Sequence, residues 1–175
     1  MSTTVPLLEV TDLQVRYQLR GGTLDAVAGV DLTLAPGEVL ALVGESGSGK
    51  STTAHAIAGL LPSSATVVGG SARFDGVELT TLGERRLRAI LGRQIGIIPQ
   101  DPTVSLNPVK RIGAQVAEVL RIHGLADRRN AAIAAVEALD RAGIPHPEAR
   151  ARQYPHELSG GMRQRVLIAI AIAAG

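Results

Sequence analysis

The stretch Gly44-Glu45-Ser46-Gly47-Ser48-Gly49-Lys50-Ser51 decides the fold of this chain, because it fits the pattern G-x-x-x-x-G-K-[ST]. It follows the wholly apolar run Val39 to Val43, which is typical of a strand buried on both faces. It precedes Ser51 to Leu61, a segment of helical composition that ends before a proline. A flexible Gly/Ser turn that happens to contain a lysine is the alternative interpretation. The flanking segments favour a strand, a phosphate-binding loop and a helix.

The residue types of this loop suit the binding of nucleotide phosphates. Glycines let backbone N–H groups surround phosphate oxygens, and the N-terminus of the following helix adds positive potential. Lys50 is expected to reach the β and γ phosphates, and the Ser51 hydroxyl to ligate Mg²⁺. Lys50 is one of only two lysines among the 18 Lys and Arg residues, which indicates a need for a compact point charge at this position.

Outside this loop, the first part of the chain reads mainly as strands and the last part as helices. Further strands are predicted at Leu8 to Tyr17, Ala26 to Leu34, Ala72 to Phe74, Val77 to Leu79 and Ile95 to Ile98. From Ile112 onward, apolar residues fall at helical spacing in two segments, Ile112 to His123 and Ile133 to Leu139. The change of pattern predicts a nucleotide-binding part at residues 1–104 and a helical subdomain at residues 105–175.

A second glycine-containing motif, Leu158-Ser159-Gly160-Gly161-Met162, precedes the last apolar segment. Ser159 can cap the helix that begins there, and the two glycines leave the first N–H groups uncovered. An ordinary serine cap with a glycine hinge is the alternative. In a chain that also carries the phosphate-loop motif, a second anion site is the preferred interpretation.

Composition limits the possible function classes. The chain has 175 residues, of which 45% are apolar, so it has enough apolar surface for a folded core and is not a disordered tail. Its net charge is only +2, which does not favour nucleic acid as a partner. The absence of cysteine excludes disulfides and thiolate metal sites. No signal peptide is recognised at Met1 to Glu9, and the apolar run Val166 to Ala174 is too short to span a bilayer.

Together these motifs resemble those of the ABC ATPases over Leu7 to Gly175. Gly44 to Ser51 resembles their Walker A motif, Leu158 to Met162 resembles their signature motif, and Gln100 stands where they carry the Q-loop glutamine. Residues 100–108 and 154–165 resemble the ATP-binding subunits of bacterial dipeptide, oligopeptide and nickel importers. Met162 departs from the glutamine that most of the superfamily carries there, in the way this importer subgroup does.

The resemblance implies site residues. Gln100 and Lys50 would be catalytic, with Gln100 contacting Mg²⁺ and the attacking water, and Ser51 and Gln100 would be metal ligands. Tyr17 would stack on adenine, although packing as a strand residue is its alternative, and a polar strand-end residue is the alternative for Gln100. The expected ATP-binding residues are Tyr17, Gly44, Glu45, Ser46, Gly47, Ser48, Gly49, Lys50, Ser51 and Thr52, with Ser159, Gly160 and Gly161 binding the γ-phosphate of ATP on the opposite subunit.

The implied fold is an α/β P-loop NTPase core of the ABC ATPase type, with an antiparallel β lobe and a helical subdomain, incomplete at its C-terminus. The implied function is to energise an importer of peptides or nickel by ATP-driven closure of a homo- or heterodimer, followed by hydrolysis. The expected partners are transmembrane permeases and, indirectly, an extracytoplasmic solute-binding protein, with no nucleic acid. The subunit would be peripheral, on the cytoplasmic face of a bacterial membrane. Alternatives are a soluble ABC ATPase acting on DNA or ribosomes, and a degenerate cassette.

Hydrolysis in this family needs an apolar strand ending in Asp-Glu, and no such run follows Gly49 in this sequence. We therefore expect the chain to be the N-terminal portion of a longer subunit, to lack ATPase activity alone, and to expose apolar surface. Other polar residues receive structural interpretations. The four histidines lack metal-site spacing, and Arg85 to Arg88 reads as a solvated helix face. Arg163 and Arg165 either add to the anion field or are solvated.

Overall fold

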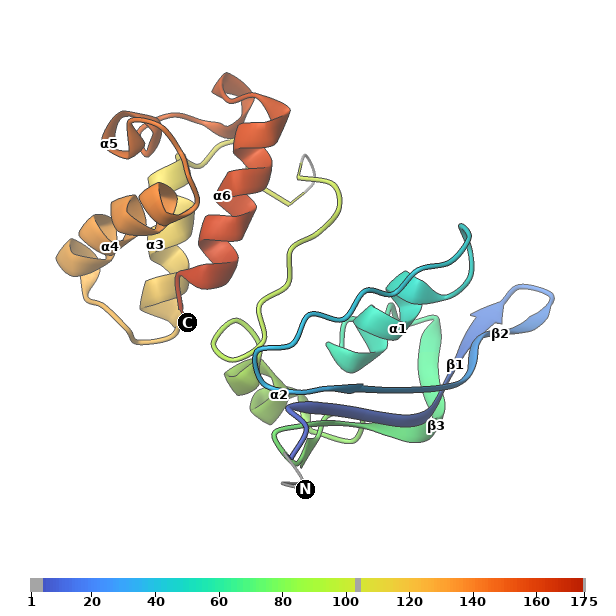
Figure 1. The fold of residues 1–175 in the computed structure, drawn as a ribbon. Helices are drawn as coiled ribbons and strands as arrows, with labels where there is room; N and C mark the ends of the chain where they lie inside the picture. The colour runs from blue at the N-terminus through green and yellow to red at the C-terminus, as the bar shows by residue number, and fades with distance from the viewer. Residues whose placement is uncertain (1–4, 103–104, 175) are drawn as a thin grey trace. The chain divides into compact units, whose positions relative to one another are not determined.

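The computed structural model describes residues 5–102 and 105–174, arranged as two compact units that divide between Leu87 and Arg88 (Figure 1). Thr103, Val104 and Gly175, which the resemblance covers, lie outside the described residues. The predicted boundary between residues 104 and 105 falls at that gap and stays a prediction.

The first unit is built on an antiparallel sheet with the strand order β2-β1-β3-β4. The long central strand β1 (Leu8–Leu19) buries Val10, Leu13 and Val15 in one cluster, and a register shift between Val10 and Leu13 interrupts the regular alternation of its side chains. The hairpin partner is β2 (Gly22–Leu34), and the other side of β1 pairs with β3 (Ala65–Phe74). The short strand β4 (Val77–Glu78) completes the sheet. These elements confirm the predicted strands that begin at Leu8, Ala26, Ala72 and Val77.

Helix α1 (Lys50–Ile57) packs against this sheet, as Figure 1 shows. Ala56 belongs to the same buried cluster as the inward side chains of β1. The helix is shorter than the predicted segment Ser51 to Leu61. It ends early because Gly59 N donates to Ala56 O and Leu60 N donates to His55 O, and these bonds close the last turn.

Two predicted strands are absent from the part of the chain that the structure describes. Val39 to Val43 has no regular secondary structure, and Val39 and Val43 are 94% and 92% exposed. Ile95 to Ile98 contributes only an isolated bridge between Ile95 and Leu91. A strand buried on both faces needs neighbouring strands for its backbone hydrogen bonds, and no described segment pairs with Val39 to Val43. The prediction of strands here was therefore wrong for this structure.

The second unit is helical, as the spacing of apolar residues predicted. Its elements are α3 (Ile112–Ile122), α4 (Arg128–Arg141), α5 (Pro147–Arg150), the 3₁₀ turn η1 (Pro155–Glu157) and α6 (Gly160–Ile172), while α2 (Glu84–Ile90) spans the division between the units. Ile112, Val116, Leu139 and Val166 are fully buried and join α3, α4 and α6 in one core. Asp127 begins α4 by accepting hydrogen bonds from the backbone N–H groups of Arg129 and Asn130.

Across the described residues, no helix combines the length and the apolar character needed to cross a membrane.

Candidate nucleotide-binding site

The phosphate-loop motif forms a compact turn directly before α1, with Lys50 as the first helical residue. The Lys50 Nζ donates to Gly44 O at 2.8 Å, to Glu45 O at 2.6 Å and to Ser48 Oγ at 3.2 Å. The ammonium group is therefore held across the loop and inside its curve of backbone. This arrangement places a compact positive charge where the glycine-rich backbone turns.

Gly49 fits a position that a side chain would block. Its φ is +90°, in the left-handed region, and a Cβ atom built on it would lie 2.5 Å from Ala26 O in strand β2. Gly47 has a similar φ of +83°, but a Cβ atom there would meet no atom within 4 Å. Gly49 is therefore required by the packing of the loop on the sheet, and Gly47 keeps the outer side of the loop open.

The N-terminus of α1 is left free of side-chain caps. Its N-cap is Gly49, no side chain accepts a hydrogen bond there, and the first turn has no acidic residue. The first N–H groups of a helix have no intrahelical acceptors and carry partial positive charge. Ser51 is exposed at this end, whereas Thr53 is buried and its hydroxyl donates to Gly49 O at 3.0 Å. Together, the loop and the start of α1 present backbone N–H groups that lack hydrogen-bond acceptors, and such groups are suited to bind an anion.

Tyr17 lies in β1 of the same unit, opposite Leu24 in β2 and Ala65 in β3. Its side chain is half-buried and packs against the cluster formed by the sheet and α1. This contact with the core is the alternative role that the sequence left open for Tyr17. The exposed part of the ring remains accessible to a ligand. Stacking of Tyr17 on adenine stays a prediction.

An ion pair lies beside Tyr17 in the hairpin of β1 and β2. Arg16 Nε donates to Asp25 Oδ1 at 2.5 Å, and Arg16 Nη2 donates to Asp25 Oδ2 at 3.1 Å. The hydrogen bond from Arg16 lowers the pKa of Asp25, and the same bond raises the pKa of Arg16. Both groups stay charged near neutral pH. The sequence does not predict this pair, because the register of β1 and β2 places Arg16 opposite Asp25.

Gln100 lies in the second unit, exposed and outside any strand. The sequence placed it at the end of the strand Ile95 to Ile98, and that strand is absent here, so the structure offers no strand end to orient its amide. Its role toward Mg²⁺ and water stays a prediction. The amide oxygen of Gln100 and the hydroxyl of Ser51 are both the hard oxygen donors that Mg²⁺ takes alongside phosphate oxygens and water.

No group of three or more His, Cys, Asp or Glu side chains in the described ranges could hold a metal ion. This finding is compatible with Mg²⁺, which is usually bound through one or two protein ligands together with substrate phosphates. The exposed Ser51 hydroxyl in the first unit therefore fits a magnesium ion that arrives with a nucleotide.

The second glycine motif forms the start of α6. Ser159 is the N-cap and its Oγ accepts from Met162 N at 3.3 Å, which confirms the predicted cap. Gly160 and Gly161 are exposed, and a Cβ atom on either would meet nothing within 4 Å. Their N–H groups are thus open to a ligand approaching along the helix axis.

Two side chains whose contacts the sequence does not predict, Arg163 and Glu157, support this helix start. Arg163 Nε donates to Pro155 O at 2.9 Å and to Leu158 O at 3.1 Å, so this arginine holds the chain before the cap. The Glu157 carboxylate accepts from Tyr154 N at 2.6 Å. Arg163 was interpreted as anion field or solvated charge, and its backbone contacts give it a positioning role instead. Only the fold of residues 155–163 could reveal this.

An aromatic and basic cluster also adjoins this segment. The rings of Tyr154 and His156 stack with centroids 5.7 Å apart, and Arg111 lies 5.9 Å from the centroid of Tyr154. The predicted site residues thus gather in two groups. Tyr17 and residues 44–52 belong to the first unit, and Gln100 with Ser159, Gly160 and Gly161 belongs to the second.

Comparison with known proteins gives a consistent picture. The family model described as ABC transporter matches residues 27–175. The chain is 51% identical over 170 residues to a putative peptide import ATP-binding protein of Brucella abortus, covering 97% of this chain and 51% of that protein. It is 48% identical over 169 residues to the oligopeptide transport ATP-binding protein OppD of Bacillus subtilis, covering 96% and 47%. The chain spans about half the length of the curated relatives it matches.

Solved structures are similar as well. A dimeric ATP-binding cassette, MJ0796, in a post-hydrolysis state bound to ADP and Pi, superposes with a TM-score of 0.83 at 27% identity. The likeness covers 95% of this chain and 69% of that one. The fold is therefore that of the P-loop ATP-binding cassettes, mixed α/β, as the resemblance implied.

Proposed function

Because the chain belongs to the ABC transporter family, we propose that it binds ATP through residues 44–52 and works as part of the ATP-hydrolysing subunit of a peptide importer. Support comes from the uncapped start of α1 and from Lys50 held across the glycine loop. The printed functions of the relatives, peptide import and oligopeptide transport, support the cargo class.

Within this proposal each residue of the loop has a physical task. The backbone N–H groups of residues 44–52 surround the phosphates, and Lys50 exchanges its backbone acceptors for phosphate oxygens. Tyr17 stacks on adenine. Ser51 and Gln100 would hold Mg²⁺, which would neutralise phosphate charge.

The proposed partner is a second ATP-binding subunit, identical or related. The exposed Gly160 and Gly161 at the start of α6 would bind the γ-phosphate of the nucleotide on that subunit, together with Ser159. The dimeric state of the similar cassette MJ0796 supports this arrangement. Membrane permeases and a solute-binding protein complete the proposed importer, with this subunit peripheral on the cytoplasmic side. None of the reported relatives has a name that points to DNA or ribosomes.

The observation that carries the proposal is the set of three Lys50 contacts, and the chain offers a matched control for it. Lys50 and Lys110 are the only lysines. Lys110 lies in the other unit, where its Nζ is 2.9 Å from Glu118 Oε1. Lys50→Ala should weaken binding of Mg-ATP by roughly 10- to 100-fold, because a charged hydrogen-bond donor to phosphate is lost. Lys110→Ala removes the same charge and should change binding less than about twofold. Equilibrium titration with a fluorescent ATP analogue measures both.

Equal weakening by the two variants would show that the loop is not the ATP site. A parallel phosphate-release assay tests the expectation from the missing Asp-Glu that this chain binds without turnover. Turnover by the pure chain that Lys50→Ala abolishes would contradict that expectation.

A further inference from the structure

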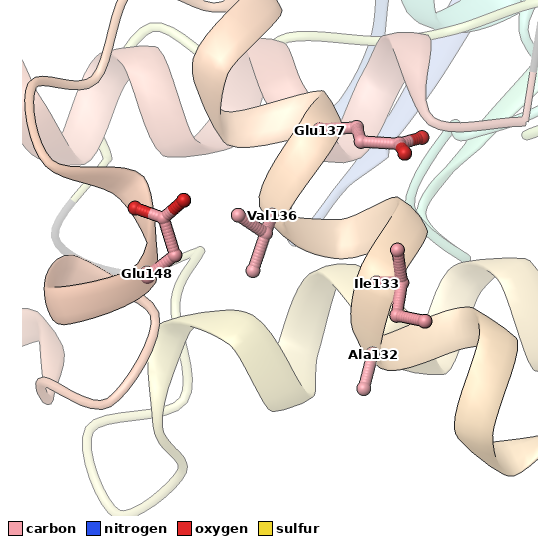
Figure 2. A pocket seen from close by; sticks show the side chains of 5 residues that line it. All are labelled: Ala132, Ile133, Val136, Glu137 and Glu148. Carbon is pink, nitrogen blue, oxygen red and sulfur yellow. The ribbon is translucent and has the colours of Figure 1, made fainter.

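A shallow hollow of about 460 Å³ lies beside α4 in the second unit, and its chemistry is unsuited to phosphate. Figure 2 shows the five side chains that line it: Ala132, Ile133, Val136, Glu137 and Glu148. The charged members of this set are both acidic, so they would repel a phosphate group. The two glycine motifs therefore remain the candidate phosphate sites.

In helix α1, Thr53 is a buried polar residue to which the proposed function gives no task. Thr53 and Gln115, at 4% and 8% exposure, are the polar residues buried among those that the structure describes. Gln115 has an evident folding role, because its amide forms hydrogen bonds with the backbone of Asn107 and Lys110 before α3. The Thr53 hydroxyl instead donates to Gly49 O at 3.0 Å. This buried hydroxyl thus contacts a backbone atom of the candidate nucleotide site.

The Gly49 carbonyl accepts two hydrogen bonds from the same residue. Thr53 N donates to Gly49 O at 2.8 Å, in addition to the bond from the Thr53 hydroxyl. The backbone bond belongs to the first turn of α1, and any residue other than proline at position 53 could form it. The hydroxyl bond requires threonine or serine. It therefore adds a restraint on the Gly49 carbonyl that the helix alone does not supply.

The backbone N–H of Lys50 lies at the other end of the peptide group that contains Gly49 O. A peptide group is planar and trans, so its N–H points opposite to its C=O. Because the carbonyl is directed along α1 toward Thr53, the Lys50 N–H is directed out of the uncapped N-terminus of the helix. Hydrogen bonds to a carbonyl also polarise the peptide group and strengthen its N–H as a donor.

We propose that Thr53 is a positioning residue for phosphate binding. Its hydroxyl fixes and polarises the peptide group between Gly49 and Lys50, whose N–H donates to a phosphate oxygen of the nucleotide. Thr53 acts from the carbonyl side of that peptide group and does not itself touch the ligand. The inference rests on the proposed function, because it concerns the same phosphate loop, and it adds a residue outside residues 44–52.

Two substitutions separate the hydroxyl of Thr53 from its shape. Thr53→Val keeps the shape and removes the hydroxyl, so it should weaken binding of magnesium tripolyphosphate by about three- to tenfold. Thr53→Ser keeps the hydroxyl and should weaken binding less than about twofold. Calorimetric titration of the whole chain measures both. The fluorescent ATP analogue should show the same ratios, because the effect lies at the phosphates and not at the base.

The stability of the same variants should follow the opposite order. Thr53→Val should leave the urea midpoint unchanged or higher, because Gly49 O keeps its backbone hydrogen bond and no buried polar group loses its partner. Thr53→Ser should lower the midpoint, because it removes a buried methyl group. Thr66→Val removes the same hydroxyl at an exposed position of β3 and should change neither binding nor stability.

The amide proton of Lys50 gives a direct signature in nuclear magnetic resonance spectra. Magnesium tripolyphosphate should shift this proton downfield in the unmodified chain and in Thr53→Ser, and shift it less in Thr53→Val, because the N–H is then a weaker donor. An equal shift in all three proteins would overturn the proposal.

The binding measurements distinguish failure of this inference from failure of the proposed function. Unchanged binding in Thr53→Val, together with weakened binding in Lys50→Ala, would overturn the role of Thr53 and leave the nucleotide site in place. Unchanged binding in Lys50→Ala would reject the nucleotide site and this role with it. Equal weakening by Thr53→Val and Thr53→Ser, or a loss in Thr53→Val that parallels a lower urea midpoint, would show that Thr53 only supports the fold.

Discussion

At Gly49 and Gly47 the phosphate loop offers two glycines of similar backbone conformation in different surroundings. Their φ values are +90° and +83°, but only Gly49 would bring a Cβ atom to 2.5 Å from Ala26 O. Gly47→Ala should lower the free energy of unfolding by about 1 kcal/mol, the cost of a left-handed alanine. Gly49→Ala should lower it by roughly 3 kcal/mol or more, because the backbone of β2 must also move. Urea denaturation of the two variants measures the difference.

The comparison of these two alanine variants isolates packing from backbone preference. Equal destabilisation would mean that the loop does not rest on Ala26 as described. Nucleotide binding is excluded from this test, since a methyl group at Gly47 would itself obstruct a ligand.

Glu78 makes the stability of the first unit sensitive to acid. Its Oε1 accepts from Thr80 Oγ1 at 2.6 Å and from the backbone N–H groups of Ala72 and Thr80 at 3.1 Å. Partial burial alone would raise the pKa of Glu78, but these hydrogen bonds, with the nearby Arg73, outweigh it and lower the pKa below its ordinary value of 4.5. The ionised carboxylate is therefore stabilised in the folded state.

A lowered pKa in the folded state gives stability that is present above the ordinary pKa and lost as pH falls through the folded pKa. The unfolding midpoint in urea should therefore decline as pH falls below 4.5. Glu78→Gln should lose about 1–2 kcal/mol at neutral pH and show a flatter decline in acid. Thr80→Val keeps the carboxyl group but removes its shortest hydrogen bond, so its decline should also be flatter. An unchanged acid slope in both variants would assign the acid sensitivity to other groups.

At the scale of elements, the start of α6 combines a structural and a proposed functional role in Ser159. Its hydroxyl caps the helix at 3.3 Å from Met162 N. Ser159→Ala should lower the free energy of unfolding by about 0.5–1 kcal/mol. Ser159→Asp should restore stability, because a carboxylate also caps and favours a helix N-terminus. Thermal denaturation of both variants measures the cap.

The two variants separate the cap from anion binding, since the added negative charge would repel phosphate. In a complete dimer, recovery of stability by Ser159→Asp without recovery of nucleotide-driven association is the expected combination. Loss of stability in Ser159→Asp as large as in Ser159→Ala would show that the hydroxyl is not a cap.

Local patterns predicted those elements whose partners are near in sequence. Helices α3, α4 and α6 and the antiparallel strands β1 and β2 form where the apolar spacing placed them, because each closes its hydrogen bonds internally or through a hairpin. Val39 to Val43 has a strand pattern but depends on distant neighbours. The apolar composition of Val39 to Val43 indicates that this segment could be buried in a sheet. It does not indicate whether neighbouring strands are present to pair with it.

At the scale of the whole molecule, the chain exposes aliphatic residues that a folded domain ordinarily covers. Val39 and Val43 are more than 90% exposed, and Ile97 and Ile98 are 38% and 44% exposed. These residues confirm the expectation that the chain exposes apolar surface. Such exposure favours association between molecules and binding of hydrophobic dyes.

Val39→Thr combined with Val43→Thr should therefore raise the solubility of the chain and lower its fluorescence with anilinonaphthalene sulfonate. Because both side chains face solvent, the free energy of unfolding should change by less than about 0.5 kcal/mol. As a control, the paired substitution Val10→Thr and Val15→Thr affects side chains that are 2% and 0% exposed and should destabilise the fold by more than 2 kcal/mol, by about 1–3 kcal/mol for each buried hydroxyl. A large loss from the first pair would mean that Val39 and Val43 are buried in solution.

The sequence by itself determined the phosphate loop, the cap at Ser159, the family resemblance and most of the helices, because these depend on residue types at short spacing. Tertiary structure alone decided that Gly49 rests on Ala26, that Arg163 holds the chain before the cap, and that Ile133 of α4 faces outward. These facts depend on which distant backbone and side-chain atoms meet. Contacts of that kind are set by packing between elements, which no local pattern of residues specifies.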